Sequence, residues 1–121
     1  MEDLRAQQIE ALEVAVPYCE KISNAMNKII VELEGDKLED TDEYLNHILK
    51  GLNWIIEIYN GTKDLINEKE QVIEKEQINS AVLELNDAIK ELNDKKKAEA
   101  IKCIVTFVEL FKSEAQRVIA E

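Results

Sequence analysis

The sequence predicts an all-α protein, an antiparallel up-down-up-down four-helix bundle in which residues 1–121 form a single domain. Apolar residues recur every three or four positions in four separate segments, a spacing that places them on one side of a helix. The chain has only three glycines and one proline, whereas an all-β protein needs turn residues about every eight to twelve positions. Apolar residues make up 45% of the chain and charged residues 34%, a balance typical of a globular domain.

The first predicted helix covers residues 3–34. Pro17 lies within its apolar stripe, so we expect either a kink at Pro17 or a helix whose first turn begins there. Gly35 is expected to cap the carboxyl end of this helix. The stripe consists of Leu12, Ala15, Cys19, Ile22, Met26, Ile29 and Leu33.

The second predicted helix covers residues 41–67. Asp40 and Glu43 have the spacing of a capping box at its start, and Gly61 is expected to fray or break it near its end. The apolar stripe consists of Leu45, Ile48, Leu52, Ile55, Tyr59 and Ile66.

The third and fourth predicted helices cover residues 75–93 and 95–120, with Asn93 and Asp94 separating them. The third stripe is out of phase with the second, so a turn is expected between Asn67 and Gln77. Short connections should make helices that follow one another in sequence antiparallel neighbours. The third stripe consists of Ile78, Ala81, Leu85, Ala88 and Leu92, and the fourth of Ile101, Ile104, Val108, Phe111, Ala115 and Val118.

The second and fourth helices are apolar over a wider arc than a core-facing stripe requires. At about 100° per residue, the arc of the fourth helix spans roughly 220°, against the ~100° that packing on one core needs. Either these helices are central in the bundle, or their flanks face each other and close the core, or the flanks form an exposed groove. In the last case Trp54, Phe107 and Leu110 are the anchors. Gly51 in mid-helix suggests that another element approaches closely. The candidate interaction surface consists of His47, Gly51, Trp54, Ile58, Cys103, Phe107 and Leu110.

The net charge of −11, from 26 acidic and 15 basic residues, argues against nucleic-acid and anionic-membrane partners. No apolar segment approaches the roughly 20 residues needed to cross a bilayer, and the first residues are polar, without a signal-like apolar region. Cys19 and Cys103 lack metal-ligand spacing and are expected to be reduced, mostly packed thiols. We therefore expect a cytoplasmic protein.

The residues that could carry chemistry do not predict an enzyme, a metal site or a cofactor. His47 is the only histidine, too few for a di-iron or zinc site. Glu10 with Glu13, followed by Glu39 with Asp42, is similar to the carboxylate set of all-α, Mg²⁺-dependent nucleotide pyrophosphohydrolases, which is the alternative function. In a chain so rich in acids such pairs arise from composition alone.

The acid-rich stretch 32–43 is interpreted as a solvated turn, with an acidic patch for a basic partner as the alternative. The function predicted for the whole chain is a non-enzymatic protein-interaction module, adaptor or chaperone-like. It would associate with itself or hold a helical segment of a partner protein in a groove between the broad flanks. A structural subunit whose flank is covered by homodimerisation is a further alternative.

Overall fold

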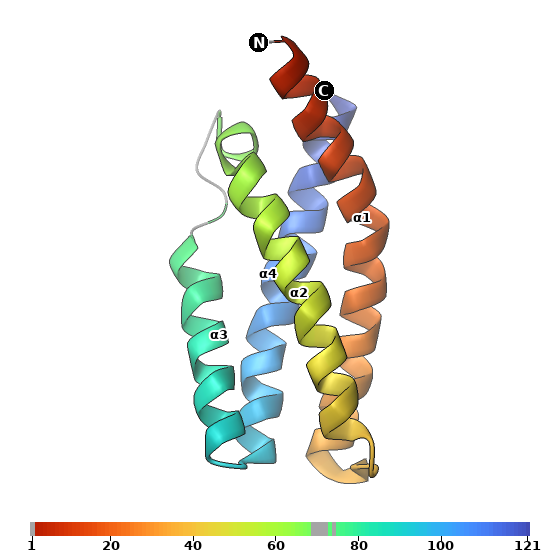
Figure 1. Ribbon diagram of the computed structural model, residues 1–121, viewed down its shortest axis with the longest axis vertical. Coiled ribbons are helices and arrows are strands. Elements are labelled where there is room, and N and C mark those ends of the chain that lie inside the picture. The colour runs from red at the N-terminus through yellow and green to blue at the C-terminus, as the bar shows by residue number, and fades with distance from the viewer. Residues whose placement is uncertain (1, 69–72, 74) are drawn as a thin grey trace.

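The computed structural model describes residues 2–68, 73 and 75–121, and over these residues the predicted all-α fold is confirmed. The chain direction reverses from each helix to the next, which confirms the up-down-up-down arrangement, and both termini lie at one end of the bundle (Figure 1). The elements are α1 (Glu2–Val31), a π-helical turn η1 (Glu32–Asp36), α2 (Thr41–Ile66), α3 (Lys75–Lys90) and α4 (Asp94–Ala120).

The first helix differs from prediction at its end. Pro17 lies inside α1, which begins at Glu2, so the alternative in which Pro17 starts the helix is wrong. Gly35 is not a left-handed cap, because no glycine that the structure describes has a positive φ. The chain instead leaves α1 through the wider turn of η1.

The starts of α2 and α4 use different contacts. Asp40 precedes α2, but its side chain makes no capping hydrogen bond. The Thr41 hydroxyl instead accepts a hydrogen bond from the Leu38 amide at 2.8 Å and donates one to the Glu32 carboxylate at 2.7 Å. At α4, the Asn93 side chain accepts a hydrogen bond from the Lys96 amide at 3.1 Å, a standard N-cap. Gly61 lies within α2 and does not end it.

The predicted apolar stripes form the core of the bundle, with one exception. Every stripe residue is buried apart from Leu92, which is 81% exposed. Because α3 ends at Lys90, Leu92 falls in the turn before α4, where its φ is 55°. Over the part of the chain that the structure describes, no helix combines the length and hydropathy needed to cross a bilayer.

The fourth helix is the centre of the packing, because it contacts all three other helices and contacts α1 most extensively. The expectation that helices adjacent in sequence pack together holds for α1 with α2 and for α3 with α4. It is wrong for α2 and α3, which share few contacts among the described residues. The predicted turn between Asn67 and Gln77 lies partly outside the described residues; within them, the Tyr59 hydroxyl donates a hydrogen bond to the Ile73 carbonyl oxygen at 3.2 Å.

Candidate interaction surface

Gly51 provides the room for a close contact between α2 and α1. A Cβ atom at this position would collide with the Tyr18 hydroxyl and would lie 2.7 Å from Ile22 Cδ1. Gly51 is buried, and both of these neighbours belong to α1. The close approach predicted from the sequence therefore occurs, and the approaching element is α1 of the same chain.

Beside Gly51, Trp54 and Tyr18 form an aromatic pair at the surface. Their ring centroids are 4.9 Å apart and their planes make an angle of 85°, the edge-to-face geometry that aromatic rings prefer. Tyr18 is half-buried, while Trp54 stays 37% exposed. The indole is thus held in place by its neighbour and still offers a large apolar surface to solvent.

The aromatic pair is part of a longer surface that runs along α1 and α2. Tyr44 and Ile58 lie seven residues before and after Gly51 and so share its side of α2. Tyr44 is 39% exposed, with Lys28 Nζ of α1 at 5.9 Å from its ring centroid. We call Tyr18, Tyr44, Trp54 and Ile58 the α1–α2 aromatic face. His47, also exposed, lies one turn from Gly51 beside this face.

Phe107, predicted as an exposed anchor, is a core residue. It is 3% exposed, because its ring packs edge-to-face on Tyr59 at a centroid distance of 5.4 Å and stacks near Phe111 at 6.2 Å. The prediction that Phe107 anchors a partner is wrong for this reason.

The flanks of α2 and α4 do not form one groove. The α4 flank lies next to α3, where Cys103, Phe107 and Leu110 line a shallow cavity of about 330 Å³ together with Gln77 of α3. The α2 flank lies against α1, on the other side of the bundle from α3 (Figure 1). Because α4 is central and α3 lies beside its flank, the seven predicted residues divide into two separate places.

The two cysteines have different environments. Cys19 is buried in the core, and the resulting desolvation raises the pKa of its thiol to about 12. The charge of Glu109 also raises this pKa, while the charge of Lys112 lowers it. It is therefore a neutral thiol at physiological pH. Cys103 is exposed, so the prediction that both cysteines are packed is wrong for Cys103.

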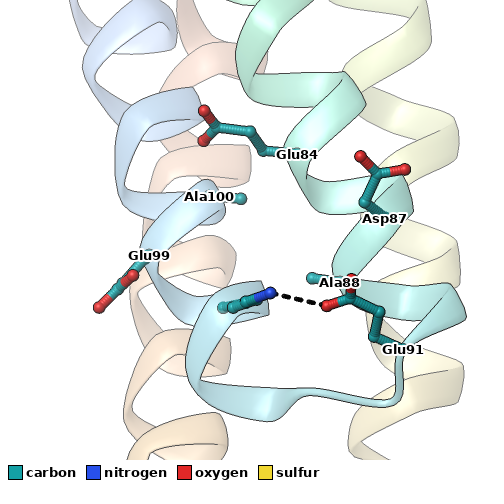
Figure 2. Close-up of a pocket in the computed structure, with 7 residues that line it drawn as sticks. Glu84, Asp87, Ala88, Glu91, Glu99 and Ala100 are labelled. Carbon is teal, nitrogen blue, oxygen red and sulfur yellow. Dashed lines mark hydrogen bonds and ion pairs between the residues drawn. The ribbon is translucent and has the colours of Figure 1, made fainter.

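An acidic pocket of about 300 Å³ lies between α3 and α4 (Figure 2). Lys96, the one basic residue of the pocket, is paired with Glu91 at 2.8 Å. Among the described residues, no group of three or more His, Cys, Asp or Glu side chains is arranged to hold a metal ion. The residues that line the pocket are Glu84, Asp87, Ala88, Glu91, Lys96, Glu99 and Ala100.

The carboxylates of the alternative hydrolase do not converge. Glu10 and Glu13 are exposed on α1 near the end that carries the chain termini, whereas Glu39 and Asp42 lie at the other end of the bundle (Figure 1). The Asp42 carboxylate is also taken up by ion pairs with two lysines. These four acids do not form a common site.

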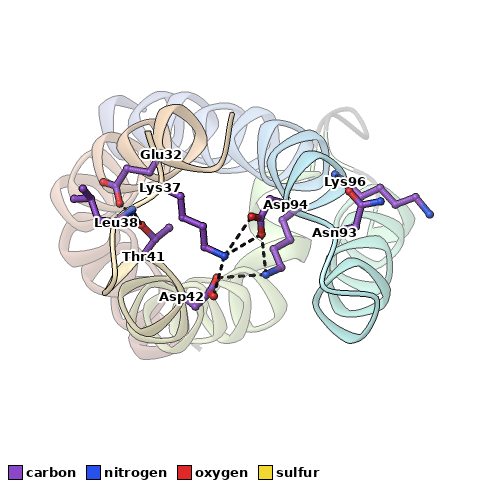
Figure 3. Close-up of polar contacts among 9 residues, drawn as sticks. Glu32, Lys37, Leu38, Thr41, Asp42, Asn93, Asp94 and Lys96 are labelled. Carbon is purple, nitrogen blue, oxygen red and sulfur yellow. Dashed lines mark hydrogen bonds and ion pairs between the residues drawn. The ribbon is translucent and has the colours of Figure 1, made fainter. Parts of the chain in front are cut away.

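Asp42 belongs to a ring of alternating charges at that end of the bundle (Figure 3). Lys37 pairs with Asp42 at 3.1 Å and with Asp94 at 3.2 Å, and Lys97 pairs with each of the two aspartates at 3.3 Å. The Lys97 side chain is only 4% exposed. Partial desolvation raises the pKa of Asp42, but hydrogen bonds from Lys37 and Lys97 outweigh it, so the net pKa is below the usual value.

The charge ring and its neighbours account for three of the seven acids in the stretch 32–43. Glu32 is buried against Thr41, Glu34 pairs with Lys102 at 2.8 Å, and Asp42 is in the ring. These acids serve contacts within the chain. Sequence reasoning missed this arrangement because Lys97 lies 55 residues from Asp42 and Lys102 lies 68 residues from Glu34 in sequence.

Comparison with known proteins places the chain in one family. The family described as "Domain of unknown function (DUF8042)" matches residues 10–114, most of the chain, so the chain belongs to it. No curated protein and no solved structure matches the chain.

Proposed function

We propose that this member of the family is a non-enzymatic protein-interaction module, adaptor or chaperone-like and cytoplasmic, that holds a helical segment of a partner protein on its α1–α2 aromatic face. The observation that carries the proposal is the position of Trp54, which is fixed against Tyr18 and yet 37% exposed. Trp and Tyr are enriched among the residues that dominate binding energy at protein interfaces.

The shape and composition of the face support a helical partner. Ile58 and Tyr44 lie on either side of the aromatic pair along α2, so apolar side chains follow the line of contact between two antiparallel helices. An amphipathic helix packs on such a row through its own apolar side chains, spaced three and four residues apart. Tyr44 and Trp54 stay partly exposed, and exposed apolar side chains grouped on one face are typical of interaction sites.

The test compares two tagged variants in affinity capture from the native cell extract. Trp54→Ala removes the proposed anchor, while the control Leu83→Ala removes a 65% exposed apolar side chain from α3. Proteins captured by the wild type should be lost with Trp54→Ala and retained with Leu83→Ala. If both variants capture the same proteins as the wild type, the aromatic face is not the binding site.

Self-association through the same face is the competing function, since two apolar faces can cover each other. Light scattering of the purified protein distinguishes the two. A dimer would also have a melting temperature that rises with protein concentration, and Trp54→Ala would abolish that dependence.

A further inference from the structure

Lysines surround the α1–α2 aromatic face. Lys21 follows Tyr18 by three residues on α1, and Lys50 precedes Trp54 by four residues on α2, so each lies one turn from its aromatic neighbour. Lys28 lies over the Tyr44 ring. The acid nearest to Trp54 along α2 on this side is Glu57, one turn further on.

These lysines have no acidic partner among the described residues, a property that they share with Lys63, Lys90, Lys95 and Lys112 elsewhere on the chain. Lys21, Lys28 and Lys50 are exposed and form no ion pair with any residue that the structure describes. By contrast, several bases away from the face are neutralised by carboxylates of the same chain. These are Arg5, Lys37, Lys96, Lys97, Lys102 and Arg117. Three lysines that are available to pair with a partner therefore lie beside the exposed aromatic rings, on a flank of α2 that also carries the exposed acids Glu43 and Glu57.

We propose that the partner of the α1–α2 aromatic face is an acidic amphipathic helix, and this proposal rests on the docking function proposed above. Its apolar side chains pack on Tyr18, Trp54 and Ile58. Carboxylates on the flanks of its apolar stripe pair with Lys21, Lys28 and Lys50, which fixes the orientation of the helix on the face.

The acids of the pocket between α3 and α4 do not prevent this contact. At physiological ionic strength charges are screened beyond about 8 Å, less than the ~10 Å width of one helix. The acid-lined pocket between α3 and α4 is thus too distant to act on a helix bound to α1 and α2. A second copy fits the face less well, because a two-fold contact would bring the same three lysines of both copies together.

The test uses two synthetic peptides of about 21 residues that carry leucines at helical spacing and contain no tryptophan. One has glutamates flanking the leucines and the other has lysines at the same positions. Binding is followed by the fluorescence of Trp54, the only tryptophan of the protein. We expect the glutamate peptide to bind the wild type at least about tenfold more tightly than the lysine peptide, since several exposed ion pairs each contribute a modest amount.

A charge-reversal variant sharpens the test. Lys21→Glu with Lys50→Glu should invert the peptide preference, whereas the control Lys90→Glu with Lys95→Glu, equal in net charge, should keep it. All four lysines are exposed, so circular dichroism should show folded proteins with similar melting temperatures. Trp54 fluorescence reports binding in both variants.

The outcomes separate the two proposals. If the lysine peptide binds the wild type as tightly as the glutamate peptide, or if both double variants behave alike, the acidic partner is excluded while the docking face stands. If neither peptide changes Trp54 fluorescence, the docking face itself is refuted and the acidic partner with it.

Discussion

The second and fourth helices have similarly broad apolar arcs, but the structure uses that breadth in different ways. On α4 most of the apolar arc is buried inside the chain, because α4 contacts α1, α2 and α3, and of the flank residues Cys103, Phe107 and Leu110 only Cys103 is exposed. On α2, one flank packs on α1 around Gly51, and the remaining aromatic surface at Trp54 stays open to solvent. A wide apolar arc on a helix therefore indicates that the helix packs against several neighbours, and those neighbours can all belong to the same chain.

The largest loss of stability is expected from a substitution of Phe107 on α4. Phe107→Ala deletes a buried ring that contacts Tyr59 and Phe111, so the free energy of unfolding should fall by about 3–5 kcal/mol. Trp54→Ala, at the partly exposed position on α2, should lower the free energy of unfolding by clearly less. Urea denaturation of both variants measures the difference. Equal losses would mean that the two helices are buried alike.

A smaller effect is expected at the charge ring that joins the loop before α2 to the start of α4. Lys97→Met keeps the buried stem but leaves Asp42 and Asp94 with one lysine fewer, so stability should fall by about 1–2 kcal/mol. In the matched control Lys96→Met, which breaks the exposed pair with Glu91, the loss should stay below about 0.5 kcal/mol. Thermal melts of the two variants at neutral pH measure the difference, and equal losses of stability would contradict the structural role of the charge ring.

Gly51→Ala tests the contact between α2 and Tyr18 of α1, and little change in stability is expected. Alanine favours the helix by roughly 0.5–1 kcal/mol, but its Cβ must displace the ends of both the Tyr18 and the Ile22 side chains, and the loss of these contacts is of similar size. The melting temperature should therefore shift little, while Trp54 emission moves to longer wavelength as the indole becomes more exposed. An unchanged emission spectrum would show that Tyr18 does not depend on the space above Gly51.

The smallest effect concerns pH. Because the pKa of Asp42 is lowered from 3.8 in the folded protein, its ion pairs stabilise the fold fully above about pH 5, and this contribution is lost as pH falls below 3.8 through the folded pKa. The stability difference between wild type and Asp42→Asn should thus shrink between pH 5 and pH 2. Urea denaturation at several pH values measures it, and a constant difference would contradict the ion pairing.

Much of the fold could be predicted from residue spacing, and less of the surface. The stripe residues from Leu12 to Val118 are buried as expected, because helical periodicity is a local property of the chain. Leu92 continued the stripe in sequence but falls beyond the end of α3. Trp54 was recognised as an edge residue, whereas Tyr18, which completes the aromatic pair, was missed because it lies outside the stripe of α1.

The sequence by itself determined the helices and the stripe that each one buries, since both depend on residues within a few turns of one another. Only the tertiary structure decided that α4 is central, that Phe107 is hidden, and that Tyr18 lies on Gly51 beside Trp54. It also decided which lysines find carboxylates. These outcomes depend on which helix packs beside which, and periodicity along one helix carries no information about the identity of its neighbours.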